Sequence, residues 1–344
     1  MPDDIIGWDV GGAHLKAARV DGAGAVRAVI QVPCALWRGL GELRLAMALA
    51  CSHVGHSAHH AVTMTGEMVD LFSNRETGVV EIARFVSEQL AGSNVRFYRG
   101  DRAFVSSDGV TAHAAAIASA NWRASVDLIA SKIAAGWFVD IGSTTTDIIA
   151  IVDGQPRFHG CDDYSRLVSG ELVYSGIVRT PLMAVLDRVQ FHGDQVPIVA
   201  EHFATMADVY RVLDELPEQA DQHPSADGAE KTSFASARRI ARIIGRDVES
   251  ATLNDWRELA RVFRAAQLSK IKTALDSVAS RVEVAQSMPI IGAGVGAFLV
   301  REMAQKKSSG YRSFAELLTR DGPVEDAVTH VAPAVAVALL AREA

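Results

Sequence analysis

Two segments of the chain combine an aspartate and a glycine turn between apolar strands. Residues 5–21 read IIGWDVGGAHLKAARVD, and residues 138–154 read FVDIGSTTTDIIAIVDG. Backbone N–H groups in such a turn point at a bound anion, and carboxylate oxygens are the ligands that Mg²⁺ prefers. The pair of segments therefore predicts a site for phosphate oxygens and a divalent cation, with Asp9 and Asp140 as the metal ligands. The alternative role for each aspartate is to cap its own turn.

Further donors surround the two turns. The second turn carries a row of hydroxyl groups, and the first is followed by a histidine and a lysine that would offset diphosphate charge. A third glycine-rich segment, residues 288–304, joins a predicted strand to a predicted helix. The predicted phosphate-binding residues are Gly11, Gly12, Ala13, His14, Lys16, Gly142, Ser143, Thr144, Thr145, Gly292 and Gly294. Hairpin geometry and tight packing would also explain the glycines, and a solvated strand position would explain the lysine, but neither explains the run of hydroxyl groups.

Four side chains are candidates for proton transfer. Glu67 and Asp70 follow a predicted strand at 60–64, where a carboxylate can deprotonate a phenol or orient an amine. His14 belongs to the residue type that titrates near neutral pH, and Asp147 is either a third metal ligand or a base. The alternatives are surface carboxylates at a helix start, a structural histidine, and an aspartate that only accepts hydrogen bonds from the backbone.

Five polar residues outside the turns are predicted to contact a substrate. An arginine guanidinium can bind a carboxylate through two parallel hydrogen bonds, and amide or ammonium groups can add single contacts. The predicted substrate-binding residues are Asn74, Arg75, Glu171, Arg179 and Lys231.

Composition narrows the class of protein. The 344 residues carry a net charge of −7 and are 49% hydrophobic, as is usual for a globular α/β protein. The negative charge argues against nucleic acid as a partner, and no apolar run reaches the ~18 residues of a membrane span. Three widely spaced cysteines and an N-terminus without a signal pattern lead us to expect a cytoplasmic protein. The expected partners are small-molecule substrates, with a homodimer as a further possibility.

The apolar patterns predict the order of the elements. We expect antiparallel strands within 5–30, further strands at 60–64 and 94–98, a loop at 217–232 and a long helix from a capping box at Thr252 to about residue 282. An apolar helix at 327–341, interrupted by Pro333, should close the chain. Two strand–hairpin units with helices between and after them predict an α/β fold with two duplicated halves that face a cleft.

These segments resemble a known superfamily. Paired Asp-x-Gly hairpins and a late glycine-rich strand–helix turn are similar to those of the sugar kinases, actin and the chaperone ATPases. The resemblance implies two ribonuclease H-like domains with mixed sheets around a central cleft. The first domain is predicted to comprise residues 1–130 and 325–344, and the second residues 131–324 with a helical insertion.

Within the superfamily, VDIGSTTTDI in the second hairpin resembles the hydantoinase A and oxoprolinase branch. Three other stretches resemble the tetrahydromethanopterin-linked C1-transfer proteins, and they read TMTGEMVDLFSNRETGV, GELVYSGIVRTPL and DGAEKTSFASARRIARIIGRD. That group includes the enzyme of methanofuran biosynthesis that joins an aminomethylfuran-methyl diphosphate to the phenol of γ-glutamyltyramine. The resemblance implies a transferase that condenses a furylmethyl diphosphate with a tyramine-type phenol, releases diphosphate and uses Mg²⁺ or another divalent cation.

The superfamily also leaves other functions open. An ATP-dependent kinase or an amide-ring hydrolase of the hydantoinase and oxoprolinase kind would use the same phosphate-binding turns. A nucleotide-sensing or scaffold protein is a non-enzymatic alternative. The superfamily often has Thr or Ser after the first glycine pair, where this chain has Ala13. Because a hydroxyl donor to phosphate is absent there, ATP is a possible but not a favoured ligand.

Overall fold

The first half of the chain forms a six-stranded mixed sheet. The computed structural model describes residues 3–282, 288–307, 309–318 and 325–344. The strands of the first sheet are β1 (Ile5–Val10), β2 (His14–Val20), β3 (Val26–Pro33), β4 (His59–Met64), β5 (Asn94–Tyr98) and β6 (Phe104–Ser106). They lie in the order β3-β2-β1-β4-β5-β6. Neighbours β1, β2 and β3 are antiparallel, whereas β4 runs parallel to both β1 and β5.

A second mixed sheet repeats the plan. Its strands are β7 (Gly136–Ile141), β8 (Thr146–Val152), β9 (Gln155–Arg157), β10 (Leu172–Val173), β13 (Ile290–Ala293) and β14 (Tyr311–Ser313). The order is β10-β8-β7-β13-β14, with β9 paired to β8. As in the first sheet, an antiparallel hairpin leads and a later strand, β13, joins it in parallel. A separate hairpin consists of β11 (Arg188–Phe191) and β12 (Asp194–Pro197).

Helices fill the space between the sheets and cover their outer faces. They are α1 (Leu40–Val54), α2 (Arg75–Gln89), α3 (Ala114–Ile117), α4 (Asn121–Ala130), α5 (Asp163–Ser169), α6 (Met206–Val212), α7 (Ser233–Ile243), α8 (Leu253–Ala279), α9 (Ala297–Lys306), α10 (Glu325–His330) and α11 (Ala332–Glu343). One hydrophobic cluster joins α4 and α11 to residues of both sheets. Because α11 is enclosed by β1, β2, β4 and α4, it is apolar almost all round.

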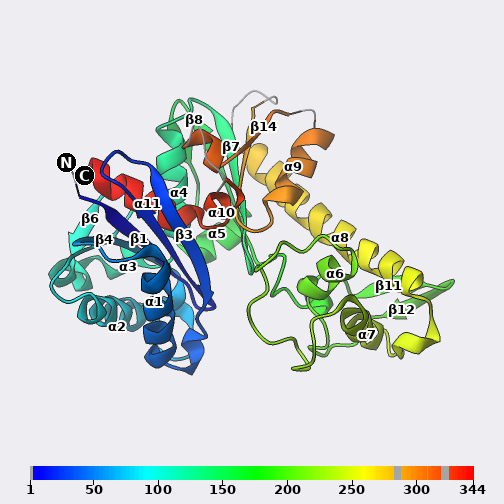
Figure 1. Cartoon of the computed structure of the whole chain (residues 1–344). Helices are drawn as coiled ribbons and strands as arrows, with labels where there is room; N and C mark the ends of the chain where they lie inside the picture. Colours follow the sequence, from blue (N-terminus) through cyan, green and yellow to red (C-terminus); the bar gives the residue numbers. More distant parts are fainter. Residues whose placement is uncertain (1–2, 283–287, 308, 319–324) are drawn as a thin grey trace.

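The outer faces belong to two other clusters. Helices α1 and α2 pack on the first sheet, and α6 to α9 pack with the second sheet and the β11–β12 hairpin. In Figure 1, α6, α7 and this hairpin lie at the far end of the long helix α8, away from the first sheet. The helical group around α8 therefore extends the second half of the chain.

The two mixed sheets with their helices confirm the predicted α/β plan. Helix α8 begins at the predicted capping box, in which Thr252 and Asp255 exchange hydrogen bonds, and residues 217–232 contain no helix or strand. The predicted closing helix is interrupted close to Pro333, since α10 ends at His330 and α11 begins at Ala332, and Pro333 stands in the first turn of α11, where a missing N–H costs nothing. The short strands β6, β9, β11 and β14 carry too few residues for the sequence pattern to reveal them. The domain boundaries stay a prediction, and one of them is set at residue 324, which lies outside the described residues. Every described helix is too short or too polar to cross a membrane.

Candidate active site

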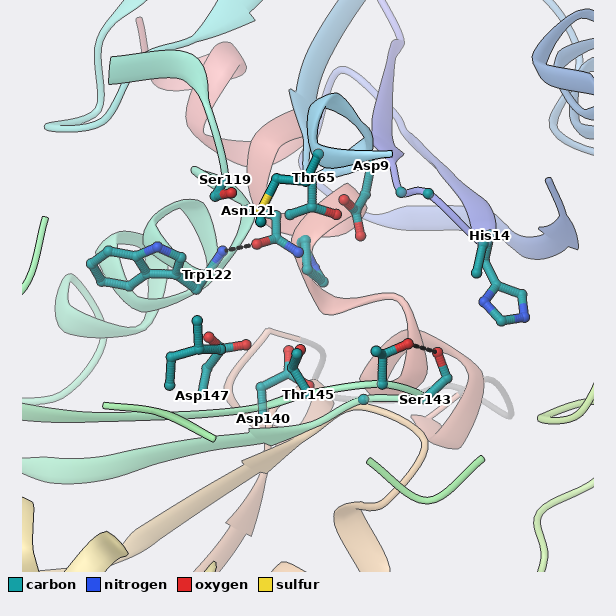
Figure 2. Close-up of a pocket in the computed structure, with 18 of the residues that line it drawn as sticks. Asp9, His14, Thr65, Ser119, Asn121, Trp122, Asp140, Ser143, Thr145 and Asp147 are labelled. Atoms are coloured by element: carbon teal, nitrogen blue, oxygen red, sulfur yellow. Dashed lines mark hydrogen bonds between the residues drawn. The ribbon is translucent and has the colours of Figure 1, made fainter. Parts of the chain in front are cut away.

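The two Asp-Gly hairpins meet at one cavity of about 340 Å³. Figure 2 shows Asp9 on one wall facing Asp140 and Thr145 on the other. The predicted site residues that line this cavity are Asp9, Gly11, Gly12, Ala13, His14, Lys16, Asp140, Gly142, Ser143, Thr144, Thr145, Asp147 and Arg179. Segments more than a hundred residues apart in the sequence therefore share one polar pocket.

Three carboxylates and one lysine form the charged centre of the cavity. Lys16 Nζ lies 3.2 Å from Asp9 Oδ2. Burial alone would lower the pKa of Lys16, but the nearby carboxylates of Asp9, Asp140 and Asp147 raise it on balance. Burial raises the pKa of Asp140 to about 7; Asp147 and Asp9 add to this rise, and Lys16 opposes it. The centre thus carries excess negative charge that a cation or a proton would relieve.

These side chains fit a divalent cation that is shared with a substrate. Asp9 Oδ1 is buried and has no hydrogen-bond partner among the described residues. The described residues contain no group of three or more His, Cys, Asp or Glu side chains placed to hold a metal by themselves. Mg²⁺ is commonly held by one or two carboxylates together with substrate phosphates. Asp9 and Asp140 suit that mode of binding, and the metal itself stays a prediction.

Asp147 faces a different partner. Its Oδ1 accepts a hydrogen bond of 2.8 Å from Arg166 Nη2, and the Arg166 guanidinium lies 4.0 Å from the ring centroid of Trp122. Burial raises the pKa of Asp147, whereas Arg166 opposes the rise. Asp147 thus forms an ion pair at the edge of the cavity, in which Arg166 is buried and Asp147 is partly buried.

The turn of the second hairpin is held by a neighbouring segment. Val178 N and Arg179 N both donate to Ser143 O, at 3.1 and 2.8 Å. Gly176 allows this approach, since a Cβ there would lie 2.4 Å from backbone atoms of Ser143 and Thr144. The turn is therefore fixed before a ligand binds, which lowers the entropic cost of binding.

The third glycine-rich segment supports the site from behind. Gly292 and Gly294 do not belong to the cavity lining. Gly294 has φ +78°, and a Cβ there would lie 2.2 Å from Asp140 Oδ1. The absence of a side chain lets β13 and its turn pack directly against Asp140.

His14 lines the cavity as a neutral imidazole. Burial lowers its pKa to about 3, and the positive charges of His223, Lys16 and Arg179 contribute. Its ring meets the His223 ring edge to face, with the ring centroids 5.0 Å apart, and Nε2 has no hydrogen-bond partner among the described residues. A neutral ring can donate or accept one hydrogen bond, but it adds no positive charge to a phosphate site.

Glu67 does not line the cavity but contacts a residue that does. Its side chain is buried, and Oε1 accepts a 2.8 Å hydrogen bond from Ser119 Oγ, which does line the cavity. Asp70 is exposed and lies outside the lining. Asn74 caps α2 by accepting from Thr77 N at 2.9 Å.

The remaining predicted substrate contacts differ in their positions. Arg75 forms an ion pair with Asp163, a residue of the lining. Glu171 is buried outside the lining, where it accepts from the backbone of residues 159 and 160 at 2.6 and 2.9 Å. Lys231 also lies outside and donates to Asp221 O at 2.8 Å. Arg179 reaches the lining and has no ion-pair partner among the described residues; its guanidinium lies 5.4 Å from the ring centroid of Trp37.

Comparison with known proteins places the chain in a family. A family model described as hydantoinase/oxoprolinase matches residues 59–342. The chain belongs to the hydantoinase/oxoprolinase family. Together with the two mixed sheets, this confirms the predicted fold class and the predicted resemblance.

Two curated relatives of this family member share one name. It is 28% identical over 278 residues to the (4-{4-[2-(gamma-L-glutamylamino)ethyl]phenoxymethyl}furan-2-yl)methanamine synthase of Methanocaldococcus jannaschii, covering 80% of this chain and 82% of the relative. It is 34% identical over 117 residues to the synthase of the same name from Methanococcus vannielii, covering 34% of this chain and 52% of the relative. A nucleotide-free structure of acetone carboxylase is similar with a TM-score of 0.59 and 11% identity, covering 98% of this chain and 70% of that chain, which shows the fold alone.

Several lining residues of this hydantoinase/oxoprolinase family member escaped the sequence argument. They are Ser119, Asn121, Trp122, Asp163, Arg166 and Tyr174, among others. The polar run GCDDYSRL at 160–167 was a usable signal for Asp163 and Arg166. Ser119 lies in an alanine-rich segment with no such signal, and only the packing of α3 and α4 brings it to the cavity.

Proposed function

We propose that the chain is a transferase that condenses a furylmethyl diphosphate with the phenol of a tyramine-type acceptor and releases diphosphate, in the biosynthesis of a methanofuran-type C1 carrier. The convergence of both Asp-Gly hairpins on one cavity carries the proposal, because such a pocket suits a diphosphate. The names of the two relatives support this choice of acceptor and donor. In the product that they name, an oxygen atom and a methylene group link the phenyl ring to the furan ring.

The pocket would act on the leaving group. Backbone N–H groups of the two turns, the hydroxyl groups of Ser143 and Thr144, and the ammonium of Lys16 would stabilise negative charge that develops on the departing diphosphate. A Mg²⁺ ion held by Asp9 and Asp140 would supply Lewis-acid stabilisation of the same charge. The furan ring can delocalise positive charge at the methylene carbon as the bond to oxygen lengthens.

The acceptor would enter beside Arg179. Its guanidinium lacks a carboxylate partner among the described residues, so it is free to bind a carboxylate such as that of a γ-glutamyl group. The exposed Tyr174 lines the same region and offers an aromatic surface to a phenol ring. The guanidinium of Arg75 lies outside the lining and forms an ion pair with Asp163, which does line the cavity.

The phenol proton needs an acceptor. Among the predicted bases, His14 has a pKa of about 3 and would hold a proton weakly at neutral pH. Asp70 lies outside the lining, and Asp147 is neutralised by Arg166. Glu67 is the remaining candidate.

A second candidate function is ATP-dependent turnover of the hydantoinase and oxoprolinase kind. Membership of that family favours it, and the same turns would hold the nucleotide phosphates. Ala13 gives the first turn no hydroxyl group, which counts against ATP as the working ligand.

Diphosphate release separates the two functions. Purified protein would receive a furylmethyl diphosphate and a γ-glutamyltyramine acceptor, with and without Mg²⁺, and parallel samples would receive ATP instead. The transferase predicts acceptor-dependent diphosphate release that requires the metal, together with a coupled product of matching mass. Phosphate release from ATP, with no coupling from the furan donor, would overturn the transferase and favour the alternative.

A further inference from the structure

A serine links the cavity to a buried carboxyl group. Ser119 Oγ donates to Glu67 Oε1 at 2.8 Å, and Glu67 is 1% exposed. Ser119 belongs to the cavity lining, whereas Glu67 does not. The Ser119 hydroxyl group is therefore a direct hydrogen-bonded link between Glu67 and the cavity.

The backbone holds Ser119 in an uncommon conformation. Ser119 has φ +51° and lies between α3 (Ala114–Ile117) and α4 (Asn121–Ala130). A left-handed conformation at a residue other than Gly costs about 1 kcal/mol or more, so the surrounding packing must impose it. Figure 2 shows the Ser119 side chain at the upper wall of the pocket. The packing thus fixes a hydroxyl group at the wall.

The hydrogen bonds around Ser119 have a consistent direction. Arg75 Nη2 lies 3.3 Å from Ser119 Oγ and can only donate to it. Asp163 Oδ2 also lies 3.3 Å from the hydroxyl oxygen, but it is already ion-paired with Arg75. The single hydroxyl proton is therefore directed at the nearer acceptor, Glu67. One lone pair of the serine oxygen remains for a donor in the cavity.

Glu67 is placed to accept a proton. Its second oxygen, Oε2, is buried and has no hydrogen-bond partner among the described residues. Burial raises the pKa of Glu67, and Asp163 adds to the rise, whereas Ser119 and Arg75 oppose it. A carboxylate with an unsatisfied oxygen in an apolar environment gains stability when it is protonated.

We propose that Ser119 and Glu67 form a proton relay for the acceptor phenol. The phenol O–H gives its proton to Ser119 Oγ, and the Ser119 proton moves to Glu67 Oε1. The phenol oxygen forms a bond to the furylmethyl carbon, the bond from that carbon to the diphosphate oxygen breaks, and its electron pair leaves with diphosphate. The relay rests on the proposed function, and Glu67 acts in it through Ser119.

Removal of the hydroxyl group tests the relay. Ser119→Ala should lower kcat for diphosphate release by roughly 10²-fold with little change in KM, because one positioned proton-transfer group is lost. Ser119→Gly also lacks the hydroxyl group but accepts a positive φ without strain, so it should show the same loss. Ser125→Ala is the control for the loss of a buried serine hydroxyl group, because Ser125 is buried in α4, outside the lining, and its hydroxyl group, unlike that of Ser119, has no partner among the described residues.

Acidic phenols separate a relay from a structural role. An acceptor with fluorine atoms beside the phenol oxygen ionises at a lower pH and needs no base. It should restore Ser119→Ala and Glu67→Gln to within about tenfold of the wild-type rate with the same acceptor, because general-base catalysis contributes little once the nucleophile is already ionised. If the variants are as impaired with the fluorinated acceptor as with the unsubstituted phenol, the relay is wrong. Disturbed packing would slow the reaction of both acceptors equally.

The double variant gives a second criterion. If Ser119 and Glu67 act as one unit, Ser119→Ala/Glu67→Gln should be about as slow as either single variant. Multiplied losses would contradict the relay. The two proposals also fail differently. Wild-type protein that never releases diphosphate defeats the proposed function, whereas active wild-type protein with equally active Ser119→Ala and Ser119→Gly variants defeats the relay alone.

Discussion

The two Asp-Gly hairpins have the same backbone but different charges. Asp9 pairs across β1 and β2 with Lys16, and in the same register Asp140 pairs across β7 and β8 with Asp147. The turns match as well, since the first residue of each donates its N–H to the carbonyl of the fourth, at 3.0 Å in the first hairpin and 2.8 Å in the second. A lysine in one hairpin thus stands where the other has an acid.

Because of this difference, the two hairpins present different charges to the cavity. In the first hairpin the lysine neutralises its own aspartate and faces the cavity. In the second, Asp147 forms its ion pair with Arg166 of α5, and Asp140 has no ion-pair partner among the described residues; burial raises the pKa of Asp140 to about 7, and Asp147 and Asp9 add to the rise. One side of the pocket offers a paired carboxylate with a positive charge, and the other a carboxylate that lacks compensation. Only the combination suits an anion and a cation together.

The largest expected effect concerns the two equivalent aspartates. Asp9→Asn and Asp140→Asn should each lower kcat/KM for diphosphate release by roughly 10²–10³-fold, the range for losing one group that stabilises developing charge. Similar losses would mean that both hairpins serve the same cation. A loss confined to one variant, with the circular dichroism spectra of both unchanged, would assign the cation to that hairpin alone.

The residues opposite the two aspartates should differ in their effect on donor binding. Asp147→Asn leaves the Arg166 guanidinium buried without a counter-charge, so the free energy of unfolding should fall by about 3 kcal/mol. Lys16→Met leaves the buried carboxylate of Asp9 without its counter-charge, so it should lower the free energy of unfolding as well. It should also raise KM for the diphosphate donor by roughly tenfold, since a charged hydrogen bond is lost. Urea unfolding and diphosphate-release kinetics on both variants measure the two quantities. An equal rise in KM in both variants would contradict the division of roles.

The sequence alone predicted that the two hairpins are alike, but not which charged residue Asp147 contacts. Repeated strand–Asp–x–Gly–strand units are a local pattern, and the structure places both units at one cavity. The partner of Asp147 could not be read in the same way. Arg166 lies on α5, and its contact with Trp122 depends on how α4 packs beside the second sheet, which is a tertiary property.

Predictions about more distant residues depended on tertiary structure even more. Glu67 follows a strand end, as expected of a functional side chain, yet its route to the cavity runs through Ser119, from a segment that no motif marked. Glu171 and Lys231 looked equally suitable as charged residues, but they bind neighbouring backbone atoms outside the lining. Charge and loop position identify candidates, and only packing decides which of them face the pocket.

The uncompensated carboxylate of the second hairpin should make stability depend on pH. The folded-state pKa of Asp140 is about 7, above the usual value near 4 in an unfolded chain, so the folded state binds the extra proton. Its stabilising contribution is present below about pH 4 and is lost as pH rises to about 7. Asp140→Asn should therefore be more stable than wild type at pH 8, by roughly 2–4 kcal/mol, and this gain should shrink at pH 5.

Thermal unfolding in the presence of a chelator measures this difference, because a bound cation would otherwise mask it. Asp9→Asn is the control from the first hairpin. It removes the ion pair with Lys16, so it should not stabilise the protein at pH 8. A stabilised Asp9→Asn variant, or an Asp140→Asn variant whose gain is the same at both pH values, would contradict the proposed asymmetry.

The smallest expected effect comes from the third position of the turns, where the first hairpin has Ala13 and the second has Thr144. Both residues line the cavity, so Ala13→Ser adds a donor on one side, and Thr144→Ala removes the equivalent donor on the other. A neutral hydrogen bond contributes about 0.5–1.5 kcal/mol, so KM for the diphosphate donor should fall up to about threefold in the first variant and rise two- to tenfold in the second. If Ala13→Ser instead gains ATP turnover, the missing hydroxyl group is what keeps this pocket from acting as a nucleotide clamp. The two hairpins would then differ in ligand choice as well as in charge.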